Sequence, residues 1–480
     1  MRRLRPLLPL VVLAALLSAF VAGCGGATGK AGSGPALAPA DATMFLTVDT
    51  DASSPQLRRA IGLLMRFPSG GKLLDKALLK GAGSMNVDDL AAAVGPQLDV
   101  VALGPPNEKD AGAVALVQPR DQAKLARLLD RSGEQYVQAE VNGWTAIAKT
   151  QAQLDRFKAD LEQGTLADSS TYQDAMAGLP SDALARIYVN AQALRPSGLT
   201  ALAGGGALAF GGAVTAETNG LRFEGFTRPS DLSTAAPYAP TLPAAAPAGT
   251  AFYVSFNHAD QALATMLDTL GRQSPSFGRS RAQAEALLGL TLKGDVLPLF
   301  HREGALAVVP GGRVPALALV LLEPDPVRAA ATVDKLVAGA NRFMRLGRVQ
   351  NVEINHVHAH QLRVKPGLAL TWAGFDGRLV LATSPAGVAA FVPNFGGQTL
   401  TADPNFRHAV AAAGMPGKTT GFVYLDFAKG VPLVEQLGRA FGAGPLPKAV
   451  HDNTAPLGAL LVYTTPDNGR LRVSGFLGIE

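Results

Sequence analysis

The chain contains an internal repeat, and this feature constrains its fold more than any other. Four segments of the first half match four segments of the second half, in the same order. The matched pairs are Pro39–Asp49 with Pro247–Asn257, Ala113–Val117 with Ala316–Val320, Ala175–Asn190 with Ala411–Asp426, and Asn219–Phe226 with Asn468–Phe476. We therefore expect two tandem copies, over residues 39–230 and 240–480, joined by a segment rich in Pro and Ala.

The residues within each copy predict an α+β fold. The matched segments alternate apolar and polar residues, which is typical of antiparallel strands with one solvent-exposed face. Ser54 and Pro55 are suited to begin a helix, and the Asn-Gly pairs at Asn219 and Asn468 predict tight hairpin turns with positive φ. We expect mainly antiparallel sheets with helices packed on one side. The expected helical stretches include Ser54–Leu64, Asp121–Arg131, Val327–Leu346 and Asp403–Ala413.

The first residues have the pattern of a secretory signal peptide. A basic tip precedes an apolar stretch from Leu7 to Phe20, which is shorter than the roughly 20 residues that span a bilayer core. Small residues up to Gly23 follow, and the next residue, Cys24, is the only cysteine. This arrangement resembles the bacterial lipoprotein signal, which implies cleavage between Gly23 and Cys24 and acyl chains on Cys24. We expect a lipid-anchored position outside the cytosol on the cell membrane, or on the outer membrane where the host has two.

Composition limits the classes of partner. Residues 1–23 are the expected signal peptide, and small and polar residues dominate residues 24–38, which predicts a flexible tether. The chain has 43 basic and 38 acidic residues without a dense basic run, so we expect no nucleic-acid interface. The hydrophobic content of 48% indicates a packed globular protein, and a single cysteine excludes a disulfide framework.

The start of the first copy carries a family resemblance. The pattern Pro-Ala-Asp-x-x-x-Phe-Leu-x-Val-Asp begins at Pro39, and Arg66-Phe67-Pro68 follows the next helical stretch. This combination resembles the bacterial envelope proteins of domain of unknown function 3352. The resemblance covers most of the chain beyond the signal peptide and implies an exported protein with no assigned activity. It supplies no functional residues.

Three histidines at a spacing of two residues are the sharpest candidate for a metal site. On a strand, His356, His358 and His360 would present their imidazoles on one face. Three histidines are a sufficient ligand set for zinc with an open fourth position. The segment also lies where the second copy is longer than the first. The alternative is the solvated face of an exposed strand, so zinc is the one cofactor to consider and the sequence otherwise predicts none.

The end of the first expected strand carries a second, weaker pattern. Asp49 and Asp51 offer half of a cation site. The second copy has Asn257 and Ala259 at these positions. The preference of Asp and Ser for turns favours a polar turn before the first helix.

The sequence shows no constellation of polar residues that indicates a reaction. We therefore expect a non-enzymatic protein with a binding or structural role in the cell envelope. Its partners would be the membrane, through the N-terminal lipid, and an unknown envelope partner. Two alternatives remain open. One is a carrier of an apolar ligand such as a lipid, since helices over a curved sheet can enclose a pocket; the other is a zinc protein that uses the three histidines.

Overall fold

The computed structural model divides the chain into two compact units. Unit 1 comprises Met1–Leu232, Asp467–Gly475 and Ile479–Glu480, and unit 2 comprises Ser233–Pro466 and Phe476–Gly478. None of the helices in the described part of the chain combines the length and the apolar character that a membrane crossing requires. The structure describes residues 34–71, 87–104, 112–132, 134–193, 209–227, 236–312, 314–344, 347–365, 368–393, 397–440 and 442–480.

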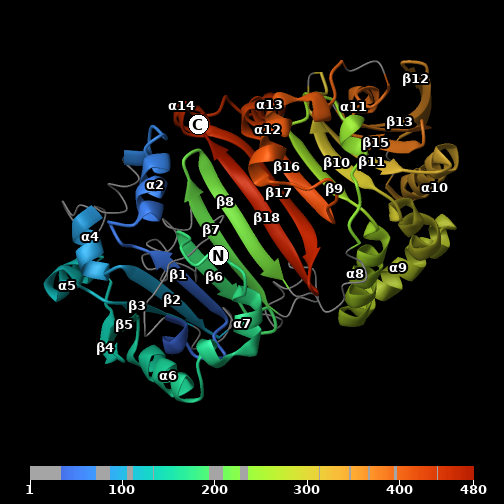
Figure 1. Ribbon diagram of the computed structural model, residues 1–480. Helices are drawn as coiled ribbons and strands as arrows, with labels where there is room; N and C mark the ends of the chain where they lie inside the picture. The colour runs from blue at the N-terminus through green and yellow to red at the C-terminus, as the bar shows by residue number, and fades with distance from the viewer. Residues whose placement is uncertain are drawn as a thin grey trace. The chain divides into compact units, whose positions relative to one another are not determined.

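Unit 1 is built on antiparallel strands in the order β8-β7-β6-β1-β2-β3-β5-β4 (Figure 1). Near the centre of the sheet, Val48 of β1 pairs with Leu98 on one side and with Ala185 on the other. β18, of which Arg470–Gly475 and Ile479 belong to this unit, pairs with β8. The strands are β1 Met44–Asp49, β2 Gln97–Leu103, β3 Gly112–Val117, β4 Val137–Val141, β5 Trp144–Ala148, β6 Ala185–Val189, β7 Phe210–Glu217, β8 Gly220–Thr227 and β18 Arg470–Ile479.

Helices pack on both faces of this sheet. Successive strand residues such as Phe45 and Leu46 point to opposite faces and enter separate hydrophobic clusters. The cluster of Phe45 includes residues of α6 and α7, and the cluster of Leu46 includes residues of α4 and α5. The prediction of helices on one side is therefore wrong here, because strands such as β2 are buried on both faces and both need cover. The helices are α2 Pro55–Leu64, α4 Val87–Val94, α5 Gln122–Arg131, α6 Gln151–Glu162 and α7 Ser170–Met176, with 3₁₀ turns η2 Gly34–Leu37 and η3 Leu166–Asp168.

Unit 2 has antiparallel strands in the order β17-β16-β9-β10-β11-β15-β14-β13-β12. In β9, Phe256 pairs with Gly304 on one side and with Gly421 on the other. The hairpin of β12 and β13 extends the sheet at one edge. The strands are β9 Phe252–Phe256, β10 Gly304–Val309, β11 Ala316–Leu322, β12 Val349–Ile354, β13 Val357–Lys365, β14 Leu368–Phe375, β15 Arg378–Ala382, β16 Gly421–Asp426 and β17 Leu457–Asp467.

The second sheet is also covered by helices on both faces. Val320 enters a cluster with residues of α11 and α12, and its neighbour Leu321 enters a cluster with residues of α10. The fold class is thus α+β with antiparallel strands, as predicted. The helices are α8 Ala259–Gln273, α9 Pro275–Leu288, α10 Pro326–Met344, α11 Pro385–Ala389, α12 Pro404–Ala413, α13 Phe427–Ala440 and α14 Lys448–Thr454, with short turns η6 Leu242–Ala244, η7 Leu292–Val296, η8 Leu297–Phe300 and η9 Leu400–Ala402.

Side-chain caps begin two of the helices that the sequence predicts, and the cap at Ser54 is itself confirmed. The Ser54 side chain accepts a hydrogen bond from the backbone N–H of Gln56 at the start of α2. Asp403 accepts the N–H groups of Asn405 and Phe406 at the start of α12. Each cap satisfies N–H groups that the first helical turn leaves without a partner.

The two predicted hairpin turns have different outcomes. Asn468 and Gly469 both have positive φ, as a primed turn requires. The hairpin of β7 and β8 instead turns at Thr218 and Asn219, and neither residue has positive φ. The tight hairpin is confirmed, but the primed turn type is wrong there, because Gly220 already pairs with Glu217 inside the sheet and does not take part in the turn.

Candidate metal centre

The three histidines of the predicted zinc strand are separated by the structure. His356 lies in the two-residue turn between β12 and β13 with φ 65°, and its side chain is 99% exposed. Only His358 and His360 lie on β13. The prediction that one strand presents all three imidazoles on one face is therefore wrong, since the hairpin turns one residue before β13 begins.

His360 already has partners in unit 2. Its ring stacks on Trp372, with the ring centroids 5.7 Å apart. Its Nδ1 lies 3.3 Å from Asp334 Oδ1, which also accepts the indole N–H of Trp372 at 3.1 Å. These contacts join β13 and β14 to α10, so His360 has a structural role in this edge of the sheet.

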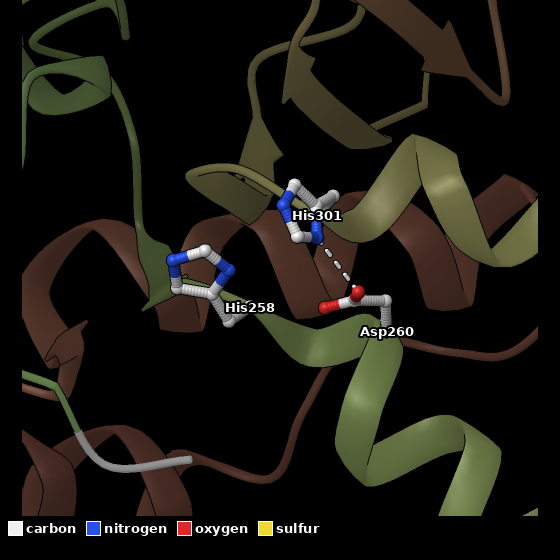
Figure 2. Close-up of side chains that lie close together, drawn as sticks. All are labelled: His258, Asp260 and His301. Atoms are coloured by element: carbon white, nitrogen blue, oxygen red, sulfur yellow. Dashed lines mark hydrogen bonds and ion pairs between the residues drawn. The ribbon is translucent and has the colours of Figure 1, made fainter. Parts of the chain in front are cut away.

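A different group of metal-ligating side chains comes together in unit 2. His258, Asp260 and His301 each offer one ligand atom, and these atoms lie within 4.8 Å of one another. Figure 2 shows the three side chains above the start of α8, with one ring nitrogen of His258 on the side where Asp260 and His301 lie. His301 Nδ1 lies 2.8 Å from Asp260 Oδ2, and the two imidazole rings are 5.0 Å apart in an edge-to-face arrangement. Within the described part of the chain, these three residues form the one group of at least three His, Cys, Asp or Glu side chains whose ligand atoms lie this close together.

Two connections of unit 2 position these side chains. β9 ends at Phe256, and His258 lies at the N-terminal boundary of α8 with left-handed φ and ψ of 51° and 40°. Asp260 lies in the first helical turn, where the helix dipole favours a carboxylate. His301 follows the short turn η8 and precedes β10, which pairs with β9. The pairing of β9 with β10 thus brings the two connections together.

The group contains unsatisfied polar atoms. His258 Nδ1 and Asp260 Oδ1 are both buried and have no hydrogen-bond partner. Leaving one buried polar atom unpaired costs about 1–3 kcal/mol. Nine buried side-chain atoms of the described residues lack a partner, and two of them belong to this group of three side chains.

The three ligand groups fit a divalent cation of intermediate softness such as zinc. Two imidazole nitrogens and one carboxylate oxygen are ligands that zinc accepts at about 2.0–2.2 Å, with a fourth position open in catalytic sites. The side chain of His301 is more exposed to solvent than that of Asp260, with exposed fractions of 61% and 18%. An ion would therefore reach the group from the side of His301.

Unit 2 also buries a cluster of charges that serves its own stability. Lys429 Nζ lies 2.8 Å from Asp403 Oδ2 and 3.0 Å from Asp426 Oδ2. Burial by itself raises the pKa of Asp426, but hydrogen bonds from Asn405 and Lys429 outweigh it and hold the pKa below its usual range. Tyr424 donates its hydroxyl to the same carboxylate at 3.1 Å. These groups satisfy one another, so we assign them a structural role.

A buried carboxyl with a perturbed pKa lies in unit 1. Asp99 on β2 is fully buried, and each of its carboxyl oxygens lies 2.9 Å from the Gln97 amide nitrogen, which donates to them. Burial raises the pKa of Asp99 to about 7, although the bonds from Gln97 and Thr47 lower it in part. A Cβ on Gly34 would lie 1.9 Å from Asp99 Oδ2, so only glycine fits against this carboxyl.

The other residues that the sequence singled out are the signal cleavage site and the two aspartates at the end of the first strand. Gly23 and Cys24 lie outside the described residues. Asp49 accepts the backbone N–H of Asp51 at 3.0 Å and a hydrogen bond from the Ser54 hydroxyl. Burial raises the pKa of Asp49, and the backbone N–H of Ser53 lowers that of Asp51. These residues form the expected polar turn.

The comparisons with known proteins identify the family. The model of the family described as Protein of unknown function (DUF3352) matches residues 89–459, which is more than half of the chain. The chain belongs to the DUF3352 family. No curated protein matches this DUF3352 chain.

Solved structures of TP0453 share a weak likeness with this DUF3352 chain. Crystal form III is 8% identical with a TM-score of 0.25, and the match covers 41% of this chain and 80% of that chain. Crystal form IV is 13% identical with a TM-score of 0.24, and the match covers 48% of this chain and 79% of that chain. At these scores the likeness carries no argument about fold or function.

Sequence reasoning missed the metal-ligating group because its members are distant. His301 lies 41 residues after Asp260, which is too far for a local sequence motif to record. The available signal was the short pattern His258-x-Asp260 directly after a strand, where the first copy has Thr50 and Ala52. This pattern could be interpreted as part of a metal-ligating group only after the pairing of β9 with β10 had placed His301 beside it.

Proposed function

We propose that this DUF3352 protein is a lipid-anchored lipoprotein on the outer face of a bacterial membrane, with a non-enzymatic binding role in the cell envelope. The observation that carries the proposal is the pattern up to Cys24: a basic tip, a short apolar stretch, small residues and then the sole cysteine. Acyl chains on Cys24 would hold the protein on the bilayer, because two or more chains anchor stably where one does not.

The segment after Cys24 supports this arrangement. About fifteen flexible residues have a root-mean-square reach of roughly 20 Å. The folded units would therefore stay close to the membrane without entering it. A partner in the envelope could then be bound while the anchor remains in place.

The anchor is tested by intact-mass measurement of protein purified from its native host. We expect a chain that begins at Cys24 and carries the mass of its acyl chains, together with partition into the detergent phase. The matched control is Cys24→Ser, which should keep the fold and lose both properties. An unmodified, uncleaved N-terminus in the wild-type protein would contradict the proposal, and so would turnover of envelope substrates by the purified chain.

We further propose that units 1 and 2 are tandem copies of one ancestral fold. The strand order β7-β6-β1-β2-β3-β5-β4 of unit 1 matches β17-β16-β9-β10-β11-β15-β14 of unit 2. Isolated bridges occur at matching places, Pro39 with Thr165 and Pro247 with Thr399. An experimental structure in which one unit has a different strand order would contradict the duplication.

A second candidate function is the carriage of an apolar ligand. A pocket of about 480 Å³ lies in unit 2, within the size range of small-molecule sites. Ala245, Ala390 and Phe391 give it apolar walls, and Arg378 offers one cation to an acidic head group. Native mass spectrometry should then detect a bound molecule that is lost in Ala244→Trp, which fills the pocket. A wild-type protein free of bound molecules would exclude this function.

A further inference from the structure

We propose that His258, Asp260 and His301 form a zinc site in unit 2, with two imidazole nitrogens and one carboxylate oxygen as ligands. The site is independent of the lipid anchor and of the apolar pocket. It also differs from the His356–His360 segment, whose three side chains do not come together. Four observations support it: the distances, the unpaired atoms, the backbone of His258 and the access from solvent.

The distances fit a common ion with little movement. Two ligand atoms at about 2.0–2.1 Å from zinc in tetrahedral geometry are about 3.3 Å apart. His301 Nδ1 and Asp260 Oδ2 are 2.8 Å apart, and the chosen ligand atom of His258 lies within 4.8 Å of both. A rotation of the His258 ring and a small separation of the other pair would bring all three to one ion.

The unpaired atoms point to a missing ligand. His258 Nδ1 and Asp260 Oδ1 are buried without hydrogen-bond partners. Neutral imidazole nitrogen and carboxylate oxygen are both zinc ligands, through either atom of each side chain. A cation held between the two side chains would satisfy both atoms at once, with Asp260 binding through Oδ1 or through both of its oxygens.

The backbone of His258 is unusual in a way that the fold does not explain. Six described non-glycine residues have positive φ, and five of them lie in hairpin turns that favour this conformation. His258, with φ 51°, is the exception at a helix start. A left-handed conformation in a residue without a turn role is typical of functional sites. It aims the ring toward the connection that carries His301.

Access and charge are also suitable. The His301 side chain is 61% exposed, so an ion can enter and the fourth coordination position can face solvent or a ligand from a partner. Asp260 neutralises part of the charge of the cation. The site would join the start of α8 to the segment just before β10. Without a bound ion, these two segments are held near each other by the pairing of β9 with β10.

The test is zinc binding by the purified full chain in detergent, freed of metal by a chelator. Equilibrium dialysis with elemental analysis should show one tightly bound zinc per chain. His258→Ala, Asp260→Asn and His301→Ala should each weaken binding at least tenfold, which is the loss that even an outer-shell partner causes. Cobalt substitution supplies a second readout, because a tetrahedral cobalt spectrum in the wild-type protein should disappear in each variant.

Two matched controls separate this site from other histidines. His451→Ala removes the histidine of another carboxylate pair, since His451 Nε2 lies 2.7 Å from Glu435 Oε1 and the two belong to no group of three metal-ligating side chains among the described residues. His356→Ala removes a fully exposed histidine. Both should change zinc affinity less than twofold. Asp260→Asn keeps the size of its side chain and remains informative if an alanine variant fails to fold.

Three outcomes would overturn the proposal. The first is a wild-type protein that binds no zinc at micromolar concentration. The second is equal zinc affinity in the wild-type protein and in His258→Ala or His301→Ala. The third is loss of zinc in a His356/His358/His360 alanine variant while the three proposed ligands remain intact. Failure of zinc binding would leave the lipid anchor unaffected, because the anchor is measured by mass.

Discussion

The connection that follows the first strand differs between the two units. In unit 1, the Thr50 hydroxyl donates a hydrogen bond to the carbonyl oxygen of Gly95 at 2.7 Å. Strand pairing places His258 and His301 at the matching positions of unit 2, because Val48 pairs with Leu98 as Phe256 pairs with Gly304. In unit 1 an internal hydrogen bond occupies this place in the sheet, whereas in unit 2 His258 Nδ1 and Asp260 Oδ1 are left without hydrogen-bond partners.

The backbone at this place limits which side chains each unit can present. Unit 1 cannot accept a side chain in place of Gly95, since its φ is 90° and a Cβ would lie 2.1 Å from the Gln118 carbonyl oxygen. Unit 2 reaches β10 through η8, and this path leaves space for an exposed histidine. The path before the second strand therefore decides whether metal ligands can be presented there.

A second difference lies at the end of the neighbouring strand. Ala185 pairs with Val48 as Gly421 pairs with Phe256, so Asn190 of unit 1 corresponds to Asp426 of unit 2. Asn190 accepts the backbone N–H of Ala193 in a local turn. Asp426 instead forms the buried ion pair with Lys429. Unit 2 therefore depends on a charged partner where unit 1 uses a neutral side chain.

The units can be followed separately because each contains one of the two tryptophans. Trp144 is buried in unit 1 and Trp372 is buried in unit 2. Variants that keep only one tryptophan report the urea unfolding of one unit at a time by fluorescence. All four predictions below use this readout.

The largest expected effect is that of Lys429→Met on unit 2. Removing the lysine leaves Asp403 and Asp426 buried together without a cation, and breaking a buried pair costs about 3–5 kcal/mol. The Trp372 signal should shift to lower urea while the Trp144 signal stays in place. Lys448→Met is the control, since its pair with Asp452 is exposed and should contribute at most about 1 kcal/mol. Equal effects of the two variants would refute this account of unit 2.

The second prediction concerns the pH dependence of unit 1. The pKa of Asp99 is raised from 3.8 to about 7 on folding, so its contribution to stability is complete below the unfolded value and is lost as pH rises through 7. Between pH 5 and pH 8 the loss amounts to about 3 kcal/mol. Asp99→Asn should remove this dependence from the Trp144 signal. Unit 2 has Ala305 at the matching position and should lack it, and an unchanged pH profile in the variant would exclude Asp99 as the cause.

Gly95→Ala should destabilise unit 1 by about 2–3 kcal/mol, because its Cβ would meet a backbone oxygen in a left-handed conformation. The matched variant of unit 2 is His301→Ala, which truncates an exposed side chain and removes its contact with Asp260, and it should change stability by at most about 1 kcal/mol in metal-free protein. A neutral Gly95→Ala would mean that this connection is not constrained as described.

The smallest expected effect is a gain. The turn Asn142-Gly143 of unit 1 and the turn Asn355-His356 of unit 2 both have two residues with positive φ, but only the first uses glycine at its second position. His356→Gly should therefore stabilise the hairpin of β12 and β13 by about 0.5–1 kcal/mol. Gly143→His is the reciprocal control and should destabilise the hairpin of β4 and β5, because φ is 79° at this position. A Cβ there would meet no atom within 4 Å, so the backbone conformation is the cause of the loss. A loss of stability in His356→Gly would show that the histidine makes a favourable contact.

Local signals predicted much of the secondary structure. The helix cap at Ser54, the helix over Pro404–Ala413 and the primed turn at Asn468 depend on residues within a few positions of one another, so the sequence indicates them directly. The turn before Gly220 could not be predicted in this way, because the pairing of Glu217 with Gly220 decides which residues form the turn.

The sequence by itself determined the α+β class and the family, since these follow from local patterns that the chain carries along its length. Only the tertiary structure decided that helices cover both sheet faces, because the partner of an apolar strand face is another segment of the chain. It alone decided the metal-ligating group as well. His258 and Asp260 acquire His301 as a neighbour through the pairing of β9 with β10, and no spacing along the chain records that contact.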